Sequence, residues 1–213
     1  MKRFIRYVAV ILIMGVGLFE LIIWGVIAQK KDVFHDTYNS VIVDKYRLLQ
    51  NTNEKKIIMI AGSSSSFGLD QDLLEEKTGY QVVNLGLHAG FGHLFPGELA
   101  KENINPGDIV LLGYEYNWYN NFEYLNQELV MTGIDDHMDL YKHIPVSHWP
   151  DFIGYLFQYA DLKNHYTQNA SGNYAREAFD AETGQMTWPR HYAMSDYYEY
   201  VDSYGEISVV NKH

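Results

Sequence analysis

Residues 57–68, IIMIAGSSSSFG, form an apolar run that ends abruptly at a glycine and four serines. A second short apolar run lies in residues 82–90, VVNLGLHAG, and ends at Asn-Leu-Gly. Short apolar runs bounded by turn residues are typical of buried β-strands. The carboxyl ends of parallel strands meet at one edge of a sheet, and ligands bind at that edge. We therefore expect the polar groups that follow these two strands to lie close together.

The sequence around these two runs alternates between strand and helix patterns. Residues 70–78 and 93–103 are predicted to be helices, the second interrupted early by a proline, and residues 81–84 and 109–113 are predicted to be strands. This order predicts right-handed crossovers and a parallel sheet whose strands are covered on both faces. The expected fold class is therefore α/β, with a three-layer α/β/α sandwich around a parallel sheet.

The remaining segments give weaker signals. Apolar residues recur at helical spacing in residues 36–51, and residues 122–131 and 151–165 are also predicted to be helices, whereas residues 168–184 have the polar composition of a loop. We find three strands, whereas doubly wound sheets have five or six. We therefore expect the domain to continue beyond His213.

Composition narrows the classes of partner. The chain has 213 residues, a hydrophobic fraction of 47% and a formal net charge of -11. Such an acidic chain repels phosphates, which excludes nucleic acid as the expected partner. Cysteine is absent, which excludes disulfides and thiol catalysis, and the nine histidines show no metal-ligand spacing. We therefore expect no metal and no other cofactor.

Residues 7–28 form a long apolar segment with a single charged residue, Glu20. The segment is long enough to cross a bilayer as a helix, and basic residues precede it at positions 2, 3 and 6. The expected protein is therefore single-pass in the cell membrane, with its soluble part outside the cytoplasm. A signal peptide cleaved after residues 26–28 is the alternative. Glu20 is costly in lipid and could face a partner membrane protein.

The strand that ends in serines resembles the nucleophile block of the SGNH (GDSL-like) hydrolase superfamily. The likeness is greatest to the membrane-anchored branch that modifies bacterial cell-surface polysaccharides and teichoic acids. It covers residues 57–119 and includes NPGDIVLLGYEYNWY at residues 105–119. The chain then divides into a membrane anchor (1–30), a juxtamembrane helix with its connector (31–55) and an SGNH-like α/β domain (56–213).

The resemblance implies specific catalytic residues. In that superfamily the nucleophilic serine precedes a glycine by four residues, and the spacing to Gly68 implies Ser64 in this role. An alignment shifted by one residue gives Ser63 instead. A backbone N–H group of Gly90 or Gly86 is then expected to bind the oxyanion of the acyl-transfer intermediate.

The third block departs from the superfamily pattern. Glu115 stands where the superfamily has an asparagine that donates to the oxyanion, and an ionised carboxylate repels that charge. Asn117 could replace it only through a rearranged loop. His88 is expected near the site as a loop or ligand contact. The Asp-x-x-His pair that supplies the base is missing, and the Asp-x-x-x-His spacings at 139–143 and 161–165 are typical of solvated helix faces.

The resemblance implies a membrane-anchored esterase or O-acyltransferase that acts on an extracellular glycan or cell-wall polymer through an acyl-serine. The alternative is a non-catalytic binding or assembly module of a surface-polysaccharide machine, which Glu115 and the missing Asp-x-x-His favour. Two further readings are a phosphate-cradling loop, which Asp70 and Asp72 at the next helix oppose, and a purely structural serine-rich turn. The acyl donor, the acceptor, the choice between hydrolysis and transfer, and the oligomeric state stay open.

Overall fold

The computed structural model describes residues 2–29, 32–113, 115, 118, 124–167, 170, 174–187, 197–201 and 207–211. Its helices are α1 (Lys2–Gln29), α2 (Val41–Asn51), α3 (Ser63–Gly68), α4 (Gln71–Thr78), α5 (Leu94–Lys101), α7 (Gln127–Gly133) and α8 (Trp149–His165). Its strands are β1 (Lys56–Ala61), β2 (Gln81–Asn84), β3 (Ile109–Gly113), β4 (Tyr197–Val201) and β5 (Ile207–Asn211). Short 3₁₀ turns include η1 (Tyr38–Ser40), η2 (Ala89–Phe91), η3 (Met138–His143), η4 (Val146–His148) and η6 (Arg176–Ala178).

The centre of the molecule is a parallel sheet with the strand order β2-β1-β3. In its register Met59 pairs with Asn84, and Ala61 pairs with Gly113. The three predicted strands are therefore confirmed, with β1 starting one residue earlier than expected. The α/β fold class is confirmed as well.

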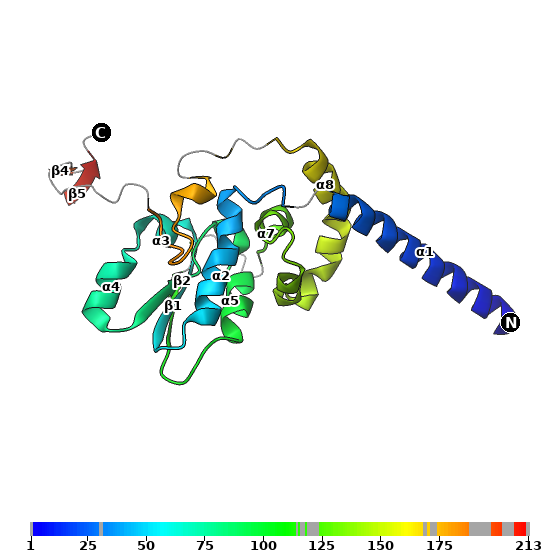
Figure 1. Cartoon of the computed structure of the whole chain (residues 1–213), viewed down its shortest axis with the longest axis horizontal. Helices are drawn as coiled ribbons and strands as arrows, with labels where there is room; N and C mark the ends of the chain where they lie inside the picture. The colour runs from blue at the N-terminus through cyan, green and yellow to red at the C-terminus, as the bar shows by residue number, and fades with distance from the viewer. Residues whose placement is uncertain are drawn as a thin grey trace.

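Helices flank this sheet on both sides (Figure 1). The chain passes from β1 to β2 through α3 and α4, and returns from β2 across β1 to β3 through α5. Because the two connections lead in opposite directions from β1, right-handed crossovers place α4 and α5 on opposite faces. The direction reverses between β1 and β3, so the loops after these two strands meet at the crevice where α/β sheets bind ligands.

One hydrophobic core joins the sheet to α2, α5, α7 and α8. The helix predicted over residues 36–51 forms as η1 followed by α2, and its apolar side chains Val41, Ile42 and Leu49 are buried in this core. The Lys45 ammonium group of α2 also donates to the Asn84 carbonyl at 2.8 Å. The segment expected beside the membrane anchor therefore packs directly on the sheet.

Three local expectations are wrong. The serines form the short helix α3 rather than a loop, because Gly62 stays extended and the helix begins at the next residue. Pro96 does not interrupt α5, since it lies in the first turn, where its missing N–H has no helical partner to lose. Strand β3 is not covered on both faces: among the strands that the structure describes it lies at the edge of its sheet, and its residues from Ile109 to Leu112 are 36–56% exposed.

The later segments are partly as predicted. Helix α8 matches the helix expected over residues 151–165, and α7 begins at Gln127, within the range expected to be helical. Residues 122 and 123 of that range lie outside the described residues. Strands β4 and β5 form an antiparallel hairpin that the sequence did not predict.

Helix α1 projects from the rest of the molecule and contacts it through α8 (Figure 1). The Phe19 ring of α1 meets the Phe157 ring of α8 edge to face, with 5.3 Å between centroids. Within the part of the chain that the structure describes, no helix is long and apolar enough to cross a membrane. The side chain of Glu20, for which a partner helix was considered, lies outside the described residues.

Candidate active site

Ser64 lies at the crevice between the carboxyl ends of β1 and β3. It is in the first turn of α3, directly after β1, and its side chain is exposed. The Ser64 Oγ donates a hydrogen bond to Glu115 Oε1 at 3.2 Å. Glu115 follows β3, so the two strand ends contribute one member each. Ser63, the alternative nucleophile, is half-buried in the same turn.

Gly62 leaves the space that the Glu115 side chain occupies. A Cβ atom at position 62 would lie 2.2 Å from Glu115 Oε1 and 2.8 Å from its Cγ. Both distances are shorter than van der Waals contact allows, so any larger residue displaces the carboxylate. The glycine at the end of β1 is therefore required for the hydrogen bond between Ser64 and Glu115.

Asn84 joins the segments that follow β1 and β2. Its Nδ2 donates to the Ser65 carbonyl at 2.9 Å, and its Oδ1 accepts from the Ser65 hydroxyl at 3.2 Å and from the Gly86 N–H at 2.9 Å. This side chain thereby fixes the position of α3 against the second loop. Sequence reasoning did not include Asn84 among the site residues, although a buried asparagine at a strand end is a recognisable signal for this role.

The two expected oxyanion donors already have acceptors in this structure. The Gly86 N–H donates to Asn84 Oδ1, and the Gly90 N–H donates to His88 Nδ1, each at 2.9 Å. An oxyanion would have to replace one of these acceptors to use either group. Asn117, the third candidate, lies outside the described residues.

His88 is held as a neutral imidazole. Burial lowers the pKa of His88 below its ordinary value of 6.5. Its Nδ1 accepts from Gly90, so the ring proton of the neutral form is on Nε2. His88 also lines a pocket. Its role as a loop or ligand contact stays a prediction.

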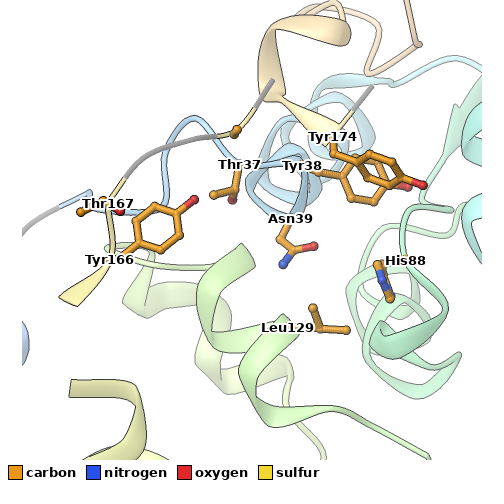
Figure 2. A pocket seen from close by; sticks show the side chains of 9 residues that line it. Thr37, Tyr38, Asn39, His88, Leu129, Tyr166, Thr167 and Tyr174 are labelled. Atoms are coloured by element: carbon orange, nitrogen blue, oxygen red, sulfur yellow. The ribbon is translucent and has the colours of Figure 1, made fainter. Parts of the chain in front are cut away.

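This pocket has a volume of about 410 Å³, within the range of sites for small ligands. Figure 2 shows its lining from η1, the loop after β2, α7 and the segment after α8. The lining mixes aromatic rings with hydroxyl, amide and imidazole groups: Thr37, Tyr38, Asn39, His88, Leu129, Tyr166, Thr167, Ala170 and Tyr174. Such a surface suits a ligand with both apolar faces and hydrogen-bonding groups.

Aromatic stacking connects the pocket to the helix that carries Ser64. The Tyr38 ring stacks on Phe67 of α3 at 5.6 Å with an interplanar angle of 5°. The Tyr174 ring meets both of these rings edge to face, at 5.7 and 5.9 Å. Burial raises the pKa of Tyr38, so its hydroxyl stays protonated and donates to the Leu87 carbonyl.

The two Asp-x-x-x-His spacings serve other parts of the molecule. His165 contacts Asp161 at 3.2 Å on an exposed face of α8. His143 is buried and its Nε2 lies 3.1 Å from the Tyr46 hydroxyl. Among the described residues, no group of three or more His, Cys, Asp and Glu side chains could hold a metal ion.

The geometry therefore brings Ser64, Glu115 and Asn84 together at one sheet edge. His88, on the loop after β2, lines the aromatic pocket beside them. Glu115, expected only to be near the site, is the direct partner of Ser64. No protein-family model, curated protein or solved structure matches the chain.

Proposed function

We propose that the protein is an SGNH-like serine esterase or O-acyltransferase that acts on an extracellular glycan or cell-wall polymer. One observation carries this proposal: an exposed serine at the end of the central strand donates its hydroxyl proton toward a carboxylate from the end of the adjacent strand. A serine hydroxyl becomes a useful nucleophile when a neighbouring group accepts its proton.

The proposed reaction uses Glu115 as the base. Ser64 Oγ attacks the carbonyl carbon of an ester while Glu115 takes the hydroxyl proton. The bond to the leaving alcohol then breaks, and Glu115 returns the proton to that alcohol. The acyl-serine is released by water in an esterase, or by a sugar hydroxyl in a transferase, in a second cycle of the same proton transfers.

Proton transfer also removes the electrostatic repulsion between Glu115 and an oxyanion. An ionised carboxylate repels the negative charge of the tetrahedral intermediate, whereas a carboxyl group that has just accepted the Ser64 proton is neutral. The N–H groups of Gly86 and Gly90 are the donors that the resemblance implies for this charge. They would serve after release from Asn84 and His88, their present acceptors.

The proposal places the enzyme at the outer face of a cell membrane, with α1 as its attachment. Apolar side chains of α1 are exposed along its described length, among them Ile11, Ile13 and Leu21 at 69–72%. The basic residues at its start favour an N-terminus in the cytoplasm. The aromatic pocket beside α3 is where the proposal seats a sugar ring of the polymer.

The direct test is turnover of p-nitrophenyl acetate by the full-length protein in mild detergent. We expect release of p-nitrophenol and an acetyl group on Ser64, detected as a mass increase of the intact protein. Ser64→Ala removes both signals, and Ser63→Ala, the matched control, retains them. Glu115→Gln slows acetylation by about 100-fold or more, because it removes the base. If Ser63→Ala loses the acetyl group and Ser64→Ala keeps it, the nucleophile is Ser63.

A non-catalytic binding module is the second candidate. The observation in its favour is that both expected oxyanion donors are already bonded within the protein. This candidate predicts that a surface polysaccharide binds equally to the wild type and to Ser64→Ala, with no acetylation of either. Loss of polysaccharide binding in Tyr174→Ala, without acetylation of the wild type, would favour it over the enzyme.

A further inference from the structure

The outer surface of α8 carries an apolar stripe. Trp149, Ile153 and Phe157 follow one another at four-residue spacing, which places them on one side of the helix. They are 47%, 54% and 57% exposed, respectively. On the other side, α8 buries Phe152 and Tyr159 in the core. The helix therefore has a second apolar surface that the core does not use.

This stripe has the chemistry of a surface in contact with hydrocarbon. The only polar atom in its side chains, the Trp149 indole nitrogen, already donates to the Ile144 carbonyl at 3.0 Å. Of the two acidic residues of α8, both exposed, Asp151 lies outside the stripe on the helical wheel. Asp161 follows Phe157 at the same four-residue spacing, so the apolar stripe ends at Phe157. A surface helix in water typically has charged and polar residues on the face opposite its core-facing stripe.

Helix α1 extends the stripe into a larger apolar surface. Phe157, the last member of the stripe, packs edge to face on Phe19 of α1 at 5.3 Å between ring centroids. Figure 1 shows α8 beside the end of α1 that joins the domain. Phe19 and Leu21 are themselves exposed large apolar residues. The apolar stripe of α8 therefore meets the apolar surface of α1 at this contact.

The position of Phe19 within α1 sets the depth of this surface relative to a membrane that surrounds α1. Phe19 precedes the end of α1 at Gln29 by ten residues, a distance of about 15 Å along a helix. If lipid surrounds α1 up to its carboxyl end, a residue in contact with Phe19 must itself lie at or below the lipid headgroups. Phe157 is such a residue, so lipid is the occupant that this contact implies.

We propose that Trp149, Ile153 and Phe157 lie in the interfacial layer of the membrane, so that α8 holds the α/β domain against the lipid surface. The inference rests on the proposed attachment of α1 to a membrane. Helices with one apolar side and one charged side bind membranes in this manner, parallel to the surface. A tryptophan at the edge of the stripe suits the headgroup region.

The absence of cysteine from the chain allows a clean test with single labels. Ile153→Cys and Phe157→Cys are labelled with a small fluorophore in the full-length protein, with Leu73→Cys as the control. Leu73 is also apolar and 50% exposed, but it lies on α4 on the far side of the sheet. The labelled proteins are placed in phosphatidylcholine–phosphatidylglycerol vesicles with or without brominated acyl chains, which quench a fluorophore that touches them.

We expect brominated lipid to reduce the signal at positions 153 and 157 by about twofold or more, and to leave position 73 unchanged. Protein that floats with the vesicles but shows no quenching at 153 and 157 would overturn the role of α8 and leave the α1 attachment standing. Protein that does not float with the vesicles would overturn both. Labels that are shielded from a water-soluble quencher and yet unaffected by bromine would show a protein partner or a second copy in place of lipid.

Discussion

At the scale of single residues, the site depends on how closely two strand ends approach each other. Gly62 has no side chain, and the Glu115 carboxylate fills the space beside it and reaches Ser64. Gly86 permits a second close approach, since a Cβ atom there would lie 1.9 Å from Ser65 Oγ. Small residues at the ends of β1 and β2 therefore let polar side chains gather at this sheet edge.

Gly62→Ala tests this close approach. The added methyl group would overlap Glu115 Oε1, so we expect the carboxylate to move away and acylation of Ser64 to fall by about 100-fold, the usual contribution of a general base. The measurement is the rate of acetylation by p-nitrophenyl acetate, alongside a melting curve. Gly68→Ala is the control, because a Cβ atom there has nothing within 4 Å. Equal acetylation rates in the two variants would show that Glu115 is not the base.

The sequence predicted Ser64 as the candidate nucleophile but did not predict which side chain accepts its hydrogen bond. The resemblance implied Ser64 because the serine run and Gly68 are close together in the chain. Glu115 is 51 positions away, and the sequence alone showed it only as a departure from a family pattern. The register of β1 with β3, which pairs Ala61 with Gly113, is what brings the two residues together.

At the scale of elements, Asn84 connects the end of β2 to α3. Its side chain takes part in three hydrogen bonds with Ser65 and Gly86, and it is buried. Removing it leaves the buried Gly86 N–H without its acceptor, which costs about 1–3 kcal/mol. It also removes the two bonds to Ser65, which contribute about 0.5–1.5 kcal/mol each.

Asn84→Ala should therefore lower the free energy of unfolding by about 2–4 kcal/mol and loosen α3. The measurement is urea unfolding followed by circular dichroism. Asn103→Ala is the comparison: the Asn103 amide makes one hydrogen bond, to the Leu99 carbonyl near the end of α5, and we expect a loss below about 1 kcal/mol. A loss at Asn84 no larger than at Asn103 would contradict the linking role.

Strand and helix positions were predictable wherever local pattern decides them. β2 and β3 have the predicted bounds, because turn residues delimit both apolar runs. The exposure of β3 was not predictable, since an apolar run looks the same in an edge strand and in a covered one. The hairpin β4–β5 was missed because Tyr and Glu crowd β4 and because neither strand shows a clear two-residue alternation.

At the scale of the whole molecule, a buried ion pair couples the fold to pH. Lys56 Nζ of β1 lies 2.9 Å from Asp108 Oδ2, which precedes β3, and the side chains are 0% and 1% exposed. Burial by itself raises the pKa of Asp108. Hydrogen bonds from the Asn105 N–H and from Lys56 outweigh this effect and lower the pKa below 3.8. A group whose pKa is lowered by folding stabilises the fold above its unfolded pKa.

The contribution of Asp108 is therefore complete above pH 3.8 and is lost as the pH falls through its lower folded pKa. We expect Asp108→Asn to cost about 3–5 kcal/mol at pH 7, because it leaves the Lys56 charge buried alone. Urea unfolding at a series of pH values checks the pH dependence. The variant should lose less stability than the wild type as the pH falls through the folded pKa of Asp108. Asp161→Asn, which removes an exposed pair with His165, should change stability by less than about 0.5 kcal/mol. Equal costs for both would contradict the account of Asp108.

The molecule as a whole pairs an α/β domain with a projecting apolar helix, and its proposed chemistry depends on one serine. The most direct measurement of that claim is labelling of the full-length protein with a fluorophosphonate, followed by mass spectrometry of the modified peptide. The account predicts a covalent adduct on Ser64 that Ser64→Ala abolishes, Ser63→Ala retains and Glu115→Gln slows. A wild-type protein that stays unlabelled, or an adduct that persists in Ser64→Ala, would contradict it.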